Sequence, residues 1–388
     1  MKRRPHIAFL TFPHTPDVNP TLPVVAVMCR RGMQVTYVTS ERFAASPSAL
    51  GANVIVCPPF RNPFREEKGS DGARGHPHVS LAIETLAKLM PYFEVNRPDV
   101  IIYDFACLAG IILAEKSGIP AIQTSPSFAF SREYLRTQKD EFGFYGDVLN
   151  ISRAGTDFLR DHGVDREFIF SKEALNIFFY PKEFQLPGYI SDETHFYASR
   201  CAPERWESSV WRNTFQNSKP LILVSTSTYY VQGPEYFRMC AEALGGLGHN
   251  VVLAIGDNND ASSIGPLPPE FEIIQAVPLI QVMPHAELLV CLGGMATSVE
   301  AMYHGVPLVM MTHGHCEAEV YAENAARLGL GFHLRKADTT VRALRRTVLD
   351  ALDDAALRGQ VAGMQRIVQR GAGAEEVANQ VTDYLRSA

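Results

Sequence analysis

The sequence predicts an α/β protein with two doubly wound domains, each built on a parallel sheet, that face each other across a cleft. The chain has 388 residues, of which 46% are hydrophobic, and this length exceeds what one ordinary core accommodates. In both halves, apolar runs of strand length alternate with segments of helical spacing, as in parallel sheets covered on both faces. A polar segment separates the halves, which predicts domains at 1–205 and 220–388 and a linker at 206–219.

The first half opens with a strand, a helix and a second strand. Residues 6–12 form an almost uninterrupted apolar run. Asn19 and Pro20 are typical of an N-cap followed by proline at the first helical position, and helical spacing continues to residue 31. A second strand is expected at 34–39. This order indicates a right-handed βαβ unit that begins a parallel sheet, whose ligands bind at the carboxyl ends of the strands.

The rest of this half continues the alternation. We expect strands at 53–57, 99–103 and 121–124, and helices at 81–92 and from residue 105 to 117. Residues 61–79 are polar and rich in glycine, which favours a surface loop. Many aromatic residues follow between 126 and 195. They either pack in the core or line an apolar cleft for a small molecule.

The second half repeats the pattern. The expected strands are 220–225, 251–255, 271–276, 288–292 and 308–311. The expected helices are 235–247, 280–285, 317–328 and most of 338–370, together with one that starts near Thr297 and ends at Gly305.

Composition narrows the classes of partner and compartment. The net charge of −6 argues against nucleic acid and anionic membranes as partners. The longest apolar stretch, 101–114, is interrupted by Asp104 and is shorter than the roughly 20 residues that a membrane helix needs, so no membrane span is expected. The apolar run at 7–12 is too short for a signal peptide. The 7 scattered cysteines favour free thiols and hence a cytoplasmic protein.

The turn after the strand at 288–292 is a candidate anion site. Gly293 and Gly294 follow the strand, and the small hydroxyl residues Thr297 and Ser298 open the next helix. Backbone N–H groups at a helix N-terminus bind phosphate, and glycines allow a pyrophosphate to approach closely. The alternative is that the two glycines only turn the chain between strand and helix.

This stretch resembles the donor-nucleotide motif of the macrolide and antibiotic glycosyltransferases, which belong to the UDP-glycosyltransferase superfamily. The resemblance is carried by Gly293-Gly294-Met295, Glu300-Ala301, His304-Gly305-Val306-Pro307 and Leu328-Gly329-Leu330-Gly331. It implies the GT-B fold of two Rossmann-like domains, in which the last helix, here about residues 374–385, packs back on the N-terminal domain. It also implies an inverting transfer of a sugar from a UDP- or dTDP-sugar to a hydroxyl of an apolar small molecule, of the polyketide type.

The same resemblance assigns the donor-binding residues. Glu300 falls at the ribose, Val277 in the segment near the nucleotide base, and Glu317 at the sugar hydroxyls. The diphosphate is assigned to Gly293, Gly294, Thr297 and Ser298, with Ser225, Thr226 and Thr228 nearby, and Met295 of the same motif also belongs to the donor-binding residues. Hydroxyl residues after a strand also serve as simple turn residues, so both interpretations of the last three stay open.

The catalytic residues are expected in the first domain. The family pattern ends in Val-Asn-Pro, as Val18-Asn19-Pro20 does, but Asp17 stands where the family usually has a histidine base. Glycopeptide-antibiotic and sterol members of the superfamily carry a carboxylate there. A base that removes the acceptor proton accelerates attack on an oxocarbenium-like C1 by about 10² to 10⁴. His14 is the alternative base. Asp104 matches the aspartate that orients the histidine of the family, and here it would face Asp17 or pair with His14. The alternatives without a catalytic role are a solvated loop carboxylate or an auxiliary cap for Asp17, and a cap of the next helix for Asp104.

Departures from the family pattern suggest other functions. Leu292, Leu279 and Ala318 replace polar residues that contact the donor in the family, whereas His313 or His315 is available to compensate. One alternative is therefore a relative with a degenerate donor site, acting as a non-glycosylating enzyme or as an auxiliary or binding protein. Another is a different nucleotide-sugar reaction, such as epimerisation. His313, His315 and Cys316 are too few ligands for a zinc site, so we expect no metal and no cofactor. The sequence leaves the oligomeric state open, and a homodimer is compatible with it.

Overall fold

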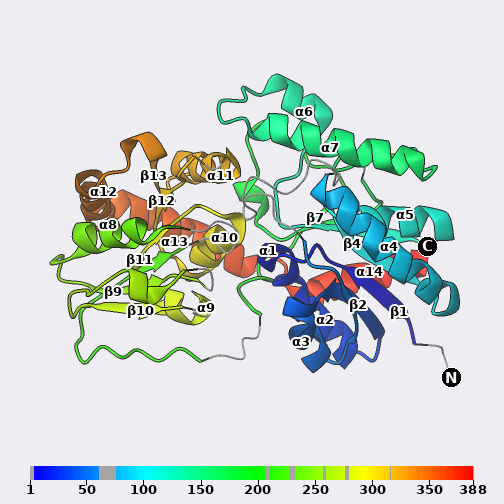
Figure 1. Cartoon of the computed structure of the whole chain (residues 1–388), viewed down its shortest axis with the longest axis horizontal. Coiled ribbons are helices and arrows are strands. Elements are labelled where there is room, and N and C mark those ends of the chain that lie inside the picture. Colours follow the sequence, from blue (N-terminus) through cyan, green and yellow to red (C-terminus); the bar gives the residue numbers. More distant parts are fainter. Residues whose placement is uncertain are drawn as a thin grey trace. The chain divides into compact units, whose positions relative to one another are not determined.

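The computed structural model describes residues 4–60, 76–170, 172–205, 210–226, 232–256, 259–275, 279–314 and 316–387. The chain divides into two compact units, which Figure 1 shows in sequence colours. Unit 1 comprises Met1–Trp206 and Gly371–Ala388, and unit 2 comprises Glu207–Arg370. No helix in these described segments is long and apolar enough to span a membrane.

Unit 1 is built on a seven-stranded sheet in the order β3-β2-β1-β4-β5-β6-β7. All neighbouring strands are parallel. The strands are β1 His6–Leu10, β2 Gln34–Ser40, β3 Asn53–Cys57, β4 Val100–Asp104, β5 Ala121–Ser125, β6 Asn176–Phe178 and β7 His195–Tyr197. Every residue of β1, β4 and β5 is buried, which explains the nearly continuous apolar sequences of β1 and β4.

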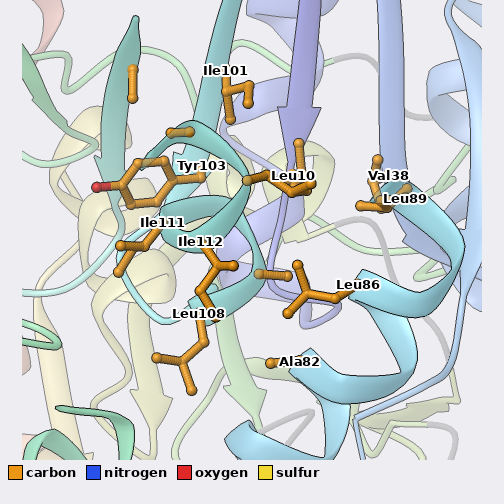
Figure 2. Close-up of a cluster of buried hydrophobic side chains, with 14 of the residues drawn as sticks. Leu10, Val38, Ala82, Leu86, Leu89, Ile101, Tyr103, Leu108, Ile111 and Ile112 are labelled. Atoms are coloured by element: carbon orange, nitrogen blue, oxygen red, sulfur yellow. The ribbon is translucent and has the colours of Figure 1, made fainter. Parts of the chain in front are cut away.

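Helices complete unit 1. They are α1 Thr15–Val18, α2 Thr21–Arg30, α3 Glu41–Ala49, α4 Pro77–Val95, α5 Leu108–Ser117, α6 Arg132–Thr137, α7 Phe144–Asp161 and α14 Ala374–Ser387, with the 3₁₀ helix η1 Lys182–Phe184. Figure 2 shows one core cluster, in which Leu86 of α4 and Ile112 of α5 meet Leu10 and Tyr103 of the sheet.

The C-terminal helix α14 belongs to unit 1 although it follows the whole of unit 2 in sequence. Its residues Val377, Ala378 and Val381 are buried in the same cluster as Val25 and Met28 of α2. The Tyr384 hydroxyl donates to the Ala121 carbonyl at 3.0 Å. Apolar burial and this hydrogen bond therefore fix the helix against unit 1.

Unit 2 is built on a six-stranded parallel sheet in the order β10-β9-β8-β11-β12-β13. The strands are β8 Leu221–Ser225, β9 Asn250–Ala254, β10 Phe271–Ile274, β11 Ala286–Cys291, β12 Leu308–Met311 and β13 Gly331–Leu334. The helices are α8 Pro234–Leu244, α9 Leu279–Val282, α10 Met295–His304, α11 Cys316–Arg327, α12 Val341–Asp353 and α13 Ala355–Arg370, and the 3₁₀ helices are η2 Ala261–Ser263, η3 Met283–His285 and η4 Lys336–Asp338. The prediction of two parallel-sheet α/β units is confirmed.

Several local expectations were wrong. Asn19 ends the short helix α1, and Pro20, not Asn19, caps α2. The Thr21 hydroxyl donates to the Val18 carbonyl at 2.7 Å and thus joins the two helices. Residues 77–79, expected in a loop, begin α4, whereas 61–75 lie outside the described residues. The strands β6, β7 and β13 and the helix α3 were not predicted.

The aromatic segment mainly supplies core. Most of the aromatic side chains between 126 and 195 are buried, and they contact one another, as in the pair Phe128–Tyr180 with ring centroids 5.7 Å apart. The buried members are Phe128, Phe130, Tyr134, Phe144, Tyr145, Phe158, Phe168, Phe178, Phe179, Tyr180 and Phe184. Core packing therefore accounts for these eleven.

Candidate active site

Two carboxylates meet at the carboxyl edge of the unit 1 sheet. Asp104 is the last residue of β4, and Asp17 lies on α1, directly after the neighbouring strand β1. Both are buried, with relative exposures of 2% and 6%. The two side chains share a hydrogen bond, which requires one of them to carry a proton.

The proton resides on Asp104. Burial raises the pKa of Asp104 well above its ordinary value, and the charge of Asp17 raises it further. The backbone N–H of Ala106 donates to Asp104 Oδ1 at 2.9 Å and opposes this shift. Burial and the charge of Asp17 therefore favour the protonated form of Asp104. Asp104 faces Asp17, and its bond with Ala106 closes the turn before α5, whose N-cap is Cys107 and not Asp104.

His14 extends this pair toward the surface. Its Nδ1 lies 3.2 Å from Asp17 Oδ2, and its side chain is 25% exposed against 6% for Asp17. His14, Asp17 and Asp104 thus form a chain of titratable groups that runs from a partly exposed imidazole to a buried carboxyl. We call this chain the carboxylate relay.

Two further side chains that the sequence did not reveal, Tyr37 and His78, lie near the relay. The Tyr37 hydroxyl lies 2.6 Å from Thr21 Oγ1, and its pKa is raised by burial and also by the charges of Asp104 and Asp17. A cavity of about 20 Å³, large enough for one water molecule, is lined by residues that include Phe12, His78 and Ala106. The ring of His78 stacks on Phe12 at 5.0 Å, and burial lowers its pKa to about 4. Contacts between residues that are far apart in the sequence place Tyr37 and His78 near the relay, so no sequence pattern predicted their position.

The two glycines of the predicted anion site, after β11 in Figure 1, have different roles. Gly293 has a φ of +91°, and a Cβ built on it would lie 3.3 Å from the Ala318 carbonyl oxygen. Its conformation and its packing both require glycine. Gly294 is the N-cap of α10 with extended backbone, and a Cβ built there would meet nothing within 4 Å. The missing side chain at Gly294 therefore leaves open space above the N-terminus of α10.

The hydroxyl residues around this turn mostly bond within the protein. Ser298 is fully buried, and its hydroxyl donates to the Gly294 carbonyl at 3.0 Å. The Thr226 hydroxyl donates to the Ile255 carbonyl at 3.1 Å. Ser225, Met295, Glu300 and Leu292 are buried, whereas Thr297 is half-buried. The structure brings these residues together at the ends of β8 and β11, and their contacts with a donor stay predictions.

The loop after β12 carries the remaining donor candidates. Glu317 is exposed and accepts a hydrogen bond from the Tyr321 hydroxyl at 2.5 Å. The ring of His313 contacts that of Tyr236, with centroids 5.1 Å apart. Thr228, Val277 and His315 lie outside the described residues. Among the residues that the structure does describe, no three His, Cys, Asp or Glu side chains form a group that could hold a metal ion.

Comparisons with known proteins agree with this architecture. Residues 238–383 match the family described as Erythromycin biosynthesis protein CIII-like, C-terminal domain. The NDP-glycosyltransferase YjiC of Bacillus subtilis (strain 168) is 30% identical over 98% of this chain and 97% of its own length. The demethyllactenocin mycarosyltransferase of Streptomyces fradiae is 30% identical over 99% of this chain and 87% of its own length.

Solved structures give the same class of fold. The calicheamicin glycosyltransferase CalG4 superposes with a TM-score of 0.80 and 29% identity, covering 99% of this chain and 98% of its own. The spinosyn rhamnosyltransferase SpnG, complexed with thymidine diphosphate, gives a TM-score of 0.75 at 16% identity, with 98% and 100% covered, and supports the fold alone.

The fold and the similarity to glycosyltransferases over nearly the whole chain thus define a GT-B glycosyltransferase. Within that class, the chain belongs to the macrolide and antibiotic glycosyltransferase family, since its similarity to the two relatives extends over nearly its whole length. The resemblance inferred from the Gly293 motif is confirmed, and so is sugar transfer in natural-product biosynthesis as the class of function.

Proposed function

We propose that this protein transfers a sugar, with inversion at C1, from UDP- or dTDP-sugar to a hydroxyl of an apolar, polyketide-type molecule, without metal or cofactor. Unit 2 binds the donor, with the diphosphate at the N-terminus of α10 above Gly294. Unit 1 activates the acceptor through the carboxylate relay. The observation that carries the proposal is the buried, hydrogen-bonded pair Asp17–Asp104 with His14 next to it.

The position of His14 at the outer end of the relay makes it the first candidate for the base, and its Nε2 is itself buried. A proton on Nδ1 that is donated to Asp17 leaves Nε2 as the basic nitrogen. The acceptor oxygen then forms its bond to C1, its proton passes to Nε2, and the C1–O bond to the diphosphate breaks. Asp17 stabilises the imidazolium that results, and neutral Asp104 holds Asp17 by a hydrogen bond without adding a second negative charge.

Asp17 is the second candidate for the base, as the sequence suggested. The pH dependence of kcat separates the two. An imidazole base loses activity as the pH falls through about 6.5, whereas a carboxylate base keeps it down to about pH 4. A profile that is flat between pH 5 and pH 8 would assign the proton transfer to Asp17.

The first experiment measures binding of UDP, dTDP and their glucose conjugates by calorimetry, followed by turnover with apolar polyketide aglycones in the presence of EDTA. We expect micromolar to millimolar binding of one nucleotide and a product of inverted anomeric configuration by NMR. Absence of binding to every nucleotide would refute the donor assignment.

A donor site that no longer functions is the second candidate function. The buried Leu292 and the internally bonded hydroxyls of Thr226 and Ser298 favour it, because fewer polar groups are then available to a diphosphate. The protein would then be an auxiliary or binding partner in biosynthesis.

We also propose that the protein is cytoplasmic and forms a homodimer, whichever of the two functions holds. Cell fractionation tests the location, and light scattering tests the oligomeric state.

A further inference from the structure

The loop after β12 contains a strained residue. His313 has a φ of 53°, and Gly314, which follows it, has a φ of 79°. Among the described residues, only Ile169 is another non-glycine residue with positive φ. A side chain in this region costs free energy and persists only where its surroundings hold it, often at a functional site. The surroundings of His313 therefore need an explanation.

Glu319 holds the loop on both sides of His313. Its Oε1 accepts hydrogen bonds from the Thr312 hydroxyl at 2.5 Å and from the Gly314 N–H at 3.2 Å. These donors belong to the residues directly before and after His313. One carboxylate oxygen thus fixes both ends of the strained residue.

Glu319 is itself fixed from the other side. Its Oε2 lies 2.8 Å from His333 Nε2, on β13, and the same nitrogen lies 3.2 Å from the Thr312 hydroxyl. Glu319 is 5% exposed and Thr312 is fully buried. A buried carboxylate with several hydrogen-bond donors is a rigid support, since removing it leaves those donors unsatisfied. We call Glu319, Thr312 and His333 the loop clamp.

The clamped histidine lies beside the donor turn. The loop opens at the carboxyl end of β12, next to β11, and the carbonyl of Ala318 on α11 would be 3.3 Å from a Cβ on Gly293. Burial lowers the pKa of His313, the charge of Lys336 lowers it further, and Glu319 opposes both. The imidazole is therefore neutral near pH 7. Its Nε2 is buried, and no group in the described residues forms a hydrogen bond with it.

We infer that Glu319 is a positioning residue, which holds His313 through the clamp so that the imidazole Nε2 binds the diphosphate or the sugar of the donor. The inference rests on the proposed function and deepens it. His313 then supplies a polar contact that Leu292 does not make. In this assignment Glu319 does not itself contact the donor, because its Oε1 accepts from Thr312 and Gly314 and its Oε2 faces His333.

The test uses variants that separate positioning from folding. Glu319→Ala removes the clamp, Glu319→Gln keeps an oxygen that accepts from Thr312 and Gly314, and Thr312→Val removes one of the two donors. His313→Asn removes the imidazole but tolerates the left-handed backbone. Glu323→Ala is the matched control, since Glu323 is a half-exposed glutamate on the same helix. Donor Kd, donor KM, acceptor KM, kcat and Tm are measured for each.

We expect Glu319→Ala to weaken donor binding about 10- to 100-fold, the equivalent of one lost hydrogen bond to a charged group, with acceptor KM unchanged. Thr312→Val should weaken donor binding several-fold, and the donor Kd of Glu319→Gln should stay within about threefold of the wild-type value. In the His313→Asn background, adding Glu319→Ala should cause no further loss. The control should match the wild type.

The outcomes also separate this inference from the proposed function. If the wild type binds no nucleotide, both fail. If it binds and Glu319→Ala lowers Tm while donor Kd and KM stay unchanged, Glu319 is only structural and this inference alone fails. Equal losses from Glu319→Ala in the presence and absence of His313 would likewise overturn it.

Discussion

The adjacent glycines of the donor turn allow stability and donor binding to be changed separately. Gly293→Ala places a methyl group on a residue with φ +91° and 3.3 Å from the Ala318 carbonyl oxygen. Holding a non-glycine residue there costs about 1–3 kcal/mol. For a unit of this size, each kcal/mol corresponds to a fall in Tm of about 2–4 °C. We therefore expect Gly293→Ala to lower the Tm by several degrees.

Gly294→Ala should instead leave the stability nearly unchanged and weaken donor binding. The backbone at Gly294 has φ −67° and ψ 146°, which alanine adopts freely, and its Cβ would meet no atom within 4 Å. Alanine is a poorer N-cap than glycine but also reduces the entropy of the unfolded chain, so the free energy of unfolding should change by less than about 1 kcal/mol. The methyl group would occupy the space assigned to the diphosphate. Loss of one charge-assisted hydrogen bond, about 1.5–3 kcal/mol, would weaken donor binding tenfold or more.

Differential scanning calorimetry and titration calorimetry with UDP and dTDP measure the two effects on the same preparations. Gly294→Ala with wild-type nucleotide affinity would show that no diphosphate approaches that turn. A Gly293→Ala protein as stable as the wild type would refute the strain argument. A lower Tm in both variants with unchanged nucleotide affinity would mean that the two glycines only turn the chain between strand and helix, which is the alternative that the sequence left open.

Three further predictions concern unit 1. Asp17→Asn should lower kcat by about 10² to 10⁴ while the nucleotide Kd stays unchanged, because the relay loses its negative charge; equal kcat would exclude Asp17 from proton transfer. Because the folded-state pKa of Asp104 is raised, its contribution to stability is complete below the unfolded pKa and is lost as pH rises through the folded value. The free energy of unfolding of Asp104→Asn, measured in urea, should therefore rise relative to that of the wild type as the pH increases from 4 to 8. A difference between the two proteins that does not change with pH would contradict this. Burial lowers the pKa of His78 to about 4, so the free energy of unfolding of the wild type should fall by up to about 3 kcal/mol between pH 6.5 and pH 4. The His78→Phe variant should not show this fall. An identical pH dependence of the two proteins would contradict the burial of His78 as its cause.

The sequence was most informative where burial is continuous. The strands β1, β4, β8 and β11 were predicted because parallel strands covered on both faces have long apolar sequences. The edge strand β13 was missed because three of its four residues are only half-buried. Strands β6 and β7 have three residues each within the aromatic segment, which is too short for a periodic signal.

The sequence identified local site features better than long-range ones. Gly293 and Gly294 are recognisable because the turn, its glycines and the helix start are contiguous. The pairing of Asp17 with Asp104 required the family pattern, since the two residues meet only when β1 and β4 become neighbours. The loop clamp was not predicted at all, because Glu319 meets His333 only through the docking of α11 on β13. No spacing along the chain encodes that contact.

The strand orders provide an argument for both sites that needs no family pattern. In unit 1 the order passes from β2 through β1 to β4, so the connections after β1 and β4 leave the sheet in opposite directions at that point. In unit 2 the same reversal occurs between β8 and β11. Open parallel sheets bind ligands at such switch points, at the carboxyl ends of the strands. The relay follows β1 and β4, and the turns with Thr226 and Gly294 follow β8 and β11. Each unit therefore places its candidate groups where its own topology opens the sheet edge.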